Sequence, residues 1–141
     1  MTIYIGSDHA GYELKELVKK HFEGRFEFVD KGTFSSESVD YPDFAHAVAE
    51  GVLKEKDGVG ILICGTGNGM AMTANKHAGI RAALCWEPAI SALAKQHNNA
   101  NILVLPARFI SSEKAIDTID SFFSAEFEGG RHQRRIDKIN L

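Results

Sequence analysis

The sequence predicts an α/β protein built on a parallel sheet of five strands, and three observations lead to this fold class. Short apolar runs rich in β-branched residues alternate with segments whose apolar residues recur at helical spacing. The alternation occurs five times, which is typical of a parallel sheet with helices on both faces. In the middle of the chain, residues 59–63 form an apolar run that leads through a glycine loop into a helix start, as expected for a strand buried on both faces.

The first part of the chain supplies a strand, a helix and a second strand. Residues 2–5 predict a short buried strand, and the turn GSDHAG follows it. Apolar residues at helical spacing predict a helix over residues 14–22, which Asp8 could cap. Residues 25–30 alternate between polar and apolar and predict the second strand.

The middle of the chain contains the second helix and two further strands. Residues 31–43 predict a loop rich in Ser and Asp, and residues 44–52 predict a helix with one apolar face. The central strand at residues 59–63 and its glycine loop come next. Residues 79–85 predict the fourth strand.

The last part of the chain supplies two helices, a strand and a basic tail. Pro88 is well tolerated in the first turn of a helix, and this helix is expected to end near His97. Residues 102–105 predict the fifth strand. Ser111 or Ser112 can cap the last long helix, the pair Gly129-Gly130 is expected to end it, and the basic segment RHQRR follows.

The glycine loop predicts an anion site. Gly65, Gly67 and Gly69 recur at every second position, and bulky side chains there would keep a ligand away from the backbone N–H groups. The helix that follows adds positive potential at the same point. A glycine-rich turn without any ligand is the alternative.

The composition indicates a globular protein of one domain, residues 1–141, with 44% hydrophobic and 25% charged residues. A net charge of −3 gives no reason to expect nucleic acid or an acidic membrane as a partner. No apolar run has spanning length, and the N-terminus has no signal-peptide layout. We therefore expect a cytoplasmic protein in which Cys64 and Cys85 are reduced thiols.

Polar residues follow the predicted strands, and ligands of open α/β sheets bind outside the carboxyl ends of the strands. The residues expected at that edge are Asp8, His9, the loop around Tyr41, the run from Cys64 to Gly69, residues 85–87 and Arg108.

One function compatible with this edge is nucleotide binding. Asp30 closes the second strand about 20 residues after the first turn, where an acid that binds ribose would lie. However, the first turn is GSDHAG and not GxGxxG, and Asp8 would repel a pyrophosphate. The later loop has Met70 where that motif needs glycine, and no GK[ST] follows it.

Metal binding is a second possibility, because the chain has six histidines. None of them pairs with another ligand residue at the HxxxH or CxxC spacings that are typical of metal sites. We therefore expect no metal and no cofactor.

The third possibility is acid–base chemistry on a small anion. Cys64 begins the glycine loop, where backbone amides and the helix dipole would lower the thiol pKa towards neutrality. A thiolate there could abstract a proton, and the loop amides with Thr66 could stabilise the negative charge that develops. The alternative is that Cys64 is only a small buried hydrophobic residue.

The basic tail predicts a second anion site. Arg131 and Arg135 are four residues apart and would share one face of a helix, so both could bind one phosphate, with Arg108 joining them. A solvated basic surface is the alternative.

Five segments of the sequence resemble, in order and spacing, the sugar-phosphate isomerase family that contains ribose-5-phosphate isomerase B and the galactose-6-phosphate and allose-6-phosphate isomerases. They are GSDHAGYELK, DKGTFSSESVDYPDFA, ICGTGNGMAMTANKHAGIRAALC, QHNNAN and GGRHQRR. The resemblance extends over residues 3–139. It implies a Rossmann-like three-layer domain and aldose–ketose isomerisation without a metal. It also implies a homodimer, in some members a dimer of dimers, with active sites at the subunit interface.

The resemblance also implies roles for individual residues. Cys64 corresponds to the base that moves a proton between C1 and C2, and His97 to the acid or base that opens the sugar ring. Asp8 lies beside the sugar hydroxyls. The enediolate is expected to contact Thr66 and the amides of Gly65, Gly67, Asn68, Gly69 and Met70; phosphate is expected at His9, Arg108, Arg131 and Arg135; sugar contacts are expected at Tyr41 and Asn98. One branch of the family has Glu where this chain has Met70, which leaves Cys64 as the matching base.

The resemblance implies the type of reaction more narrowly than it implies which sugar phosphate reacts. Interconversion of ribose 5-phosphate and ribulose 5-phosphate is the expected activity. Isomerisation of allose 6-phosphate, galactose 6-phosphate or a tetrulose phosphate stays open, because the chemistry at C1 and C2 is the same. A sugar-phosphate or nucleotide-binding module without turnover is the remaining alternative.

Overall fold

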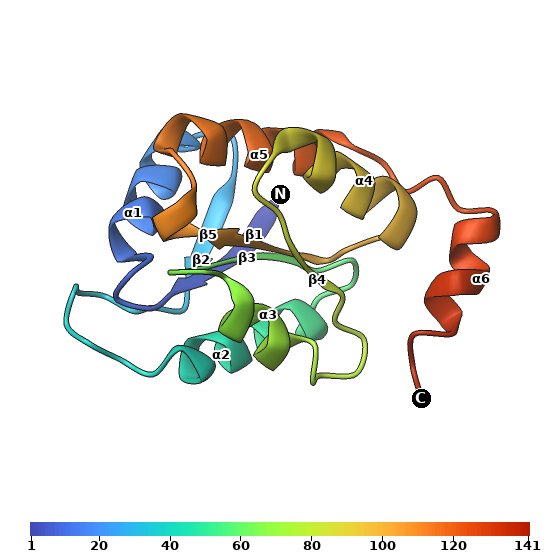
Figure 1. The fold of residues 1–141 in the computed structure, drawn as a ribbon, viewed down its shortest axis with the longest axis horizontal. Helices are drawn as coiled ribbons and strands as arrows, with labels where there is room; N and C mark the ends of the chain where they lie inside the picture. The colour runs from blue at the N-terminus through green and yellow to red at the C-terminus, as the bar shows by residue number, and fades with distance from the viewer.

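The computed structural model describes residues 1–141 as a five-stranded sheet with helices on both faces (Figure 1). The strands are β1 (Thr2–Ser7), β2 (Glu27–Asp30), β3 (Val59–Cys64), β4 (Ala82–Leu84) and β5 (Ile102–Pro106), in the spatial order β2-β1-β3-β5-β4. All neighbouring strands pair in parallel. The predicted fold class is confirmed.

Helices cover the two faces of this sheet. One face is covered by α1 (Tyr12–His21), α4 (Pro88–Asn98) and α5 (Ser112–Ser124), and the other by α2 (Tyr41–Lys54) and α3 (Asn68–Ala74). A short 3₁₀ helix, η1 (Ala107–Phe109), follows β5, and α6 (Arg131–Asp137) packs against α4 at one end of the molecule (Figure 1). None of the helices combines the length and the apolar character needed to cross a membrane.

The hydrophobic core consists of one layer on each face of the sheet. Ile61 and Ile63 of β3 point into the layer under α1, α4 and α5, whereas Leu62 points into the layer under α2 and α3. All three side chains are fully buried. The central strand is therefore buried on both faces, as its unbroken apolar run predicted.

Two predicted boundaries of the middle of the chain were wrong. Helix α2 begins at Tyr41, so the preceding loop ends at Asp40 and not at residue 43. Strand β4 covers only Ala82–Leu84 of the predicted residues 79–85. The N–H of Arg81 donates to the side chain of Asn101 (2.8 Å) and not to a strand. Gly79 has a positive φ of 90°. The strand therefore begins only at Ala82.

The last long helix also ends earlier than predicted. It stops at Ser124, before the glycine pair, because Ala125 has an extended backbone. The N–H of Glu128 donates to the carbonyl of Gln96 (3.0 Å), which attaches this extended segment to the end of α4. Gly130 then precedes α6, so the basic tail is helical as expected.

The two predicted helix caps had different outcomes. Ser111 caps α5, because its side chain accepts a hydrogen bond from the N–H of Lys114 (3.1 Å). Asp8 does not cap α1, whose N-cap residue is Gly11. Instead its Oδ1 accepts a hydrogen bond from the N–H of Gly11 (3.0 Å) and closes the turn between β1 and α1.

Candidate active site

Three neighbouring strands, β1, β3 and β5, bring reactive side chains to one edge of the sheet. Asp8 follows β1, Cys64 ends β3, and Arg108 lies in η1 after β5. The N–H of Asp8 donates to the carbonyl of Ile63 (3.2 Å), and the N–H of Arg108 donates to the carbonyl of Gly65 (3.0 Å). Because parallel strands end at the same edge, a carboxylate, a thiol and a guanidinium lie together there.

Cys64 is almost fully buried, with 5% of its surface exposed. Burial raises the pKa of its thiol, and the backbone N–H groups of Met70 and Gly67 lower it only in part. Of the nearby charges, Asp8 raises this pKa and Arg108 lowers it. The net pKa lies above that of an ordinary thiol, so the predicted shift towards neutrality was wrong: desolvation outweighs the amides.

The glycines of this loop make room for protein side chains. Gly67 has a positive φ of 81°, and a Cβ there would collide with Leu84. A Cβ on Gly69 would collide with the ring of Tyr41, which lies across that glycine. The space at Gly69 is thus taken by Tyr41, at the start of α2, and not left open for a ligand as the sequence had indicated.

The remaining side chains of the loop are polar and accessible. The Oγ1 of Thr66 accepts a hydrogen bond from the N–H of Asn68 (3.3 Å), the first residue of α3. Thr66 is exposed, so its hydroxyl proton is free to be donated to a bound oxygen.

His9 lies at the same edge and is held by the loop between β2 and α2. The N–H of Val39 donates to Nδ1 of His9 (3.2 Å). When the imidazole is neutral, Nδ1 must therefore be the acceptor nitrogen and Nε2 must carry the proton. His9 can then donate from Nε2 to an anion.

A buried ion pair attaches that loop to the sheet. The Nζ of Lys15, which is fully buried, lies 2.7 Å from both carboxylate oxygens of Asp30 and 2.7 Å from the carbonyl oxygen of Thr33. Burial raises the pKa of Asp30, but hydrogen bonds from Lys15, Lys19 and the Gly32 N–H outweigh it and leave this pKa lowered. Both carboxylate oxygens of Asp30 already accept hydrogen bonds from the protein, so this residue cannot bind a ribose. This argues against the nucleotide-binding alternative.

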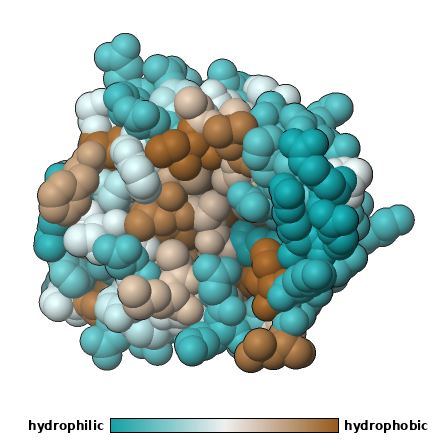
Figure 2. Space-filling model, turned by 45° about the vertical axis from the view of Figure 1, so that its right-hand side comes forward, coloured by the Kyte–Doolittle hydropathy of each residue, from teal (hydrophilic) through white to brown (hydrophobic).

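A second group of candidate residues lies around the end of α4. His97 and Asn98 end that helix, and Arg131 and Arg135 lie on α6, which packs against it. A cavity of about 370 Å³ is lined by His97, Asn98, His132, Arg135, Ile136 and Ile139. A larger groove of about 660 Å³ runs between the tail and the β4 edge, and its lining includes Asn98, Arg81, Ile139 and Leu141. Figure 2, which brings this side forward, shows hydrophobic side chains next to a hydrophilic ridge.

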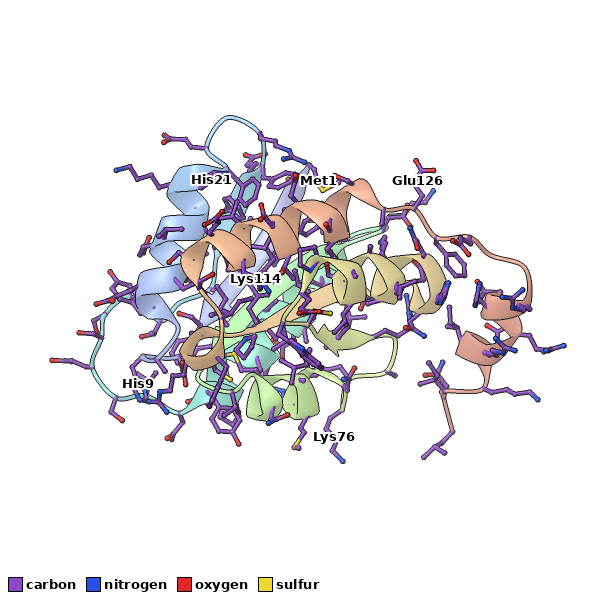
Figure 3. All side chains as sticks on the ribbon, turned by 45° about the horizontal axis from the view of Figure 1, so that its top comes forward. Met1, His9, His21, Lys76, Lys114 and Glu126 are labelled. Carbon is purple, nitrogen blue, oxygen red and sulfur yellow. The ribbon has the colours of Figure 1, made fainter.

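The two groups lie at opposite edges of the sheet. Cys64 is at the carboxyl end of β3, whereas α4 runs back across the face and ends at Asn98, just before β5 begins. Figure 3 shows His9 at one end of the molecule and α6 at the other. One chain therefore does not bring Cys64 and His97 together, and Arg108 does not join Arg131 and Arg135 as the sequence had indicated.

Comparison with known proteins identifies the family. The model of the family described as Ribose/Galactose Isomerase matches residues 3–139. The chain belongs to the ribose/galactose isomerase family. This isomerase is 46% identical to ribose-5-phosphate isomerase B of Escherichia coli over 138 residues, which is 97% of this chain and 93% of that protein.

Solved structures agree with this assignment. The isomerase matches a ribose 5-phosphate isomerase of Thermotoga maritima with a TM-score of 0.95 and 55% identity, over 99% of this chain and 97% of that one. It matches ribose-5-phosphate isomerase B of Mycoplasma genitalium, solved with bound ribulose-5-phosphate, with a TM-score of 0.94 and 50% identity, over 98% and 93% of the two chains. The prediction of a sugar-phosphate isomerase is confirmed.

Sequence reasoning missed two residues of the isomerase beside His97. The ring of His132 stacks on that of His97, with 4.3 Å between the centroids and 12° between the planes. Glu128 lies beside both rings. The only signal in the sequence was the spacing of four between Glu128 and His132, which does not point to His97.

Proposed function

We propose that this isomerase interconverts ribose 5-phosphate and ribulose 5-phosphate, with Cys64 as the base. The thiolate of Cys64 removes the proton on C2 of the open-chain aldose, and the electron pair moves to the carbonyl oxygen on C1. In the resulting enediolate, the proton on O2 passes to O1, which leaves the negative charge on O2. The C2 carbonyl then forms as C1 takes the proton back from Cys64, which gives the ketose and restores the thiolate. Atoms and charge balance without an oxidant or a cofactor.

The observation that carries this proposal is the meeting of Cys64, Asp8 and Arg108 around the glycine loop, at the edge where parallel sheets bind ligands. The N–H groups of Gly67 and Met70 already point at the Cys64 sulfur. Together with Thr66 and the other loop amides, from Gly65 to Met70, they can stabilise the oxygen that becomes negative next to it.

Binding of the sugar phosphate has support at the edge of the sheet where Cys64 lies. His9, with Nε2 as its donor nitrogen, and Arg108 can bind phosphate oxygens near Cys64. Tyr41 and Asp8 can contact hydroxyl groups of the sugar. The relative from Mycoplasma genitalium was solved with ribulose-5-phosphate bound, which favours a five-carbon substrate over the six-carbon and four-carbon alternatives.

We infer that a second copy of the chain completes the site. His97, Asn98, Arg131 and Arg135 lie at the edge opposite Cys64, so they can reach a substrate held there only from another subunit. The groove of about 660 Å³ beside α6 offers room for part of that copy. In a symmetric dimer, each contact occurs twice and produces two equivalent sites. His97 of the second copy then opens the ring, and the two tail arginines share the phosphate.

A panel of substrates tests the activity. We expect turnover of ribose 5-phosphate in the presence of EDTA, with slower or no turnover of allose 6-phosphate, galactose 6-phosphate and erythrulose 4-phosphate. Cys64→Ala should lower kcat by 10² to 10⁴, about 3–5 kcal/mol of barrier, as is typical of the loss of a general base. Cys85→Ala is the matched control, because Cys85 is fully buried on the other face of the core.

Two outcomes would contradict the proposal. Retention of more than about a tenth of kcat in Cys64→Ala would assign the base to another residue. Binding of ribose 5-phosphate with no turnover by the wild-type protein would favour a sugar-phosphate-binding module.

A further inference from the structure

Three potential metal ligands come together beside α6, outside the group around Cys64. His97 comes from the end of α4, Glu128 from the extended segment before α6, and His132 from α6 itself. The Oε1 of Glu128 lies 3.7 Å from Nε2 of His97 and 3.6 Å from Nε2 of His132. These three ligand atoms all lie within 4.8 Å of one another.

The two distances to Glu128 are close to those around a small tetrahedral cation. Zinc binds imidazole nitrogen and carboxylate oxygen at about 2.0–2.2 Å, which places neighbouring ligand atoms of a tetrahedron about 3.3–3.5 Å apart. The two distances to Glu128 exceed this by only a few tenths of an ångström. We propose that His97, Glu128 and His132 form a binding site for a zinc-class divalent cation, with a fourth position open to water.

The protein holds part of this site in place and leaves part of it adjustable. His132 is buried, and the N–H of Glu128 donates to the carbonyl of Gln96 (3.0 Å), which ties the segment of Glu128 to the helix of His97. The side chains of His97 and Glu128 are 40% and 52% exposed. They can therefore turn from the stacked arrangement of the two rings to point their ligand atoms at one ion.

The choice of cation follows from the ligand types. Two imidazoles and one carboxylate are typical of zinc sites with an open position, whereas magnesium and calcium prefer oxygen ligands throughout.

The surrounding charges limit the affinity. Arg131 and Arg135 are close enough to affect the pKa of His132, and both repel a cation. Glu128 supplies the one negative charge among the ligands. We therefore expect weaker binding than at a structural zinc site. The occupancy of the site should depend on the concentration of free metal.

Occupancy of this site would affect the reaction. Under the proposed function, on which this step alone rests, His97 moves a proton to open the sugar ring. A cation bound to Nε2 of His97 removes that lone pair. Zinc should then inhibit turnover of the cyclic aldose.

Direct binding tests the site without any measure of activity. Zinc chloride is titrated calorimetrically into the wild-type protein and into Glu128→Gln and His132→Asn, and we expect one zinc per chain and at least tenfold weaker binding in each variant. His46→Asn is the matched control. The Nδ1 of His46 lies 2.7 Å from Nε2 of His77 in an exposed pair, and this pair has no third ligand.

Cys64 is a competing zinc ligand, so Cys64→Ala is titrated as well and should still bind one zinc. Binding that is unchanged in both Glu128→Gln and His132→Asn would overturn the site, as would binding that disappears in His46→Asn or Cys64→Ala. Circular dichroism checks that each variant is folded. Zinc that binds as expected but leaves turnover unaffected would support the site and contradict the role of His97 in ring opening, which separates the two proposals.

Discussion

Cys64 and His97 lie at opposite edges of the same sheet, one at the carboxyl end of β3 and the other at the end of α4, beside the start of β5. A single chain cannot place both on one sugar. This relationship leads to a complementation test of the shared site. Cys64→Ala and Arg131→Ala, each nearly inactive, are unfolded and refolded together.

In a mixed dimer, both substitutions fall in one active site, and the other active site keeps all of its native residues. Random pairing makes about half of the dimers mixed, so recovery should approach about a quarter of wild-type activity. Size-exclusion chromatography with light scattering first verifies that the refolded mixture is dimeric. No recovery from a verified mixture would place both residues in the site of one subunit.

His97→Asn should affect a cyclic substrate more than an open-chain one. Ribose 5-phosphate is mostly a ring, and its opening needs proton transfer at the ring oxygen. Ribulose 5-phosphate cannot close a five-membered ring, because its O5 carries the phosphate. Initial rates in both directions, or exchange of the C1 proton of the ketose with solvent, measure the difference. Equal losses for both substrates would contradict a role in ring opening.

The raised pKa of Cys64 predicts a pH dependence of its reactivity. Only the thiolate reacts, so a raised pKa means that little of it is present at pH 7, and the rate should rise about tenfold per pH unit up to that pKa. Alkylation by iodoacetamide, followed by mass spectrometry, should show this rise, and kcat/KM should follow it. Cys85, whose pKa burial raises to about 12, should stay unmodified. An alkylation rate that stops rising below pH 8 would contradict this prediction. It would show that the backbone amides lower the thiol pKa by more than burial raises it.

The hydrogen bond from Val39 to His9 predicts one tautomer for this imidazole. At a pH where His9 is neutral, the proton should be on Nε2, because Nδ1 accepts from the backbone N–H at 3.2 Å. Nitrogen-15 NMR distinguishes the two ring nitrogens. His21, which is exposed and forms no hydrogen bond through its ring, serves as the reference for a mixture of tautomers. A proton on Nδ1 of His9 would contradict the proposed donation from Nε2 to phosphate.

The buried pair of Lys15 and Asp30 predicts a large loss of stability when it is broken. Asp30→Asn leaves the ammonium of Lys15 buried without its counter-ion, and about 3–5 kcal/mol should be lost from the free energy of unfolding. Lys19→Gln removes only the partly exposed bridge to the same carboxylate, so less than about 1 kcal/mol is expected. Urea unfolding at one fixed protein concentration measures both.

The same pair should respond to acid in a defined direction. The pKa of Asp30 is lower in the folded protein than in the unfolded chain, so its contribution is complete above the unfolded pKa and is lost as the pH falls through the folded one. The difference in the free energy of unfolding between wild type and Asp30→Asn should therefore become smaller in strong acid. A difference that does not change with pH would contradict this assignment.

The sequence by itself determined the sheet and the edge where the candidate site residues meet. The unbroken apolar run before Cys64 predicted a strand buried on both faces, because side chains of a strand alternate between two sides and here both had to be apolar. Given parallel strands, Asp8, Cys64 and Arg108 had to meet at one edge. The roles proposed for them came from the family resemblance, because neither spacing nor composition contained them.

Only the tertiary structure decided the state of Cys64 and the place of His97. The pKa of a thiol depends on how much water and which charges surround it, and burial depends on the packing of residues that are distant in sequence. The place of His97 depends on the direction in which α4 crosses the sheet, and this carries the end of the helix to the edge opposite Cys64. The stacking of His132 on His97 is decided in the same way. It depends on the segment from Ala125 to Glu128, which is hydrogen-bonded to the end of α4 through Gln96 and leads into α6.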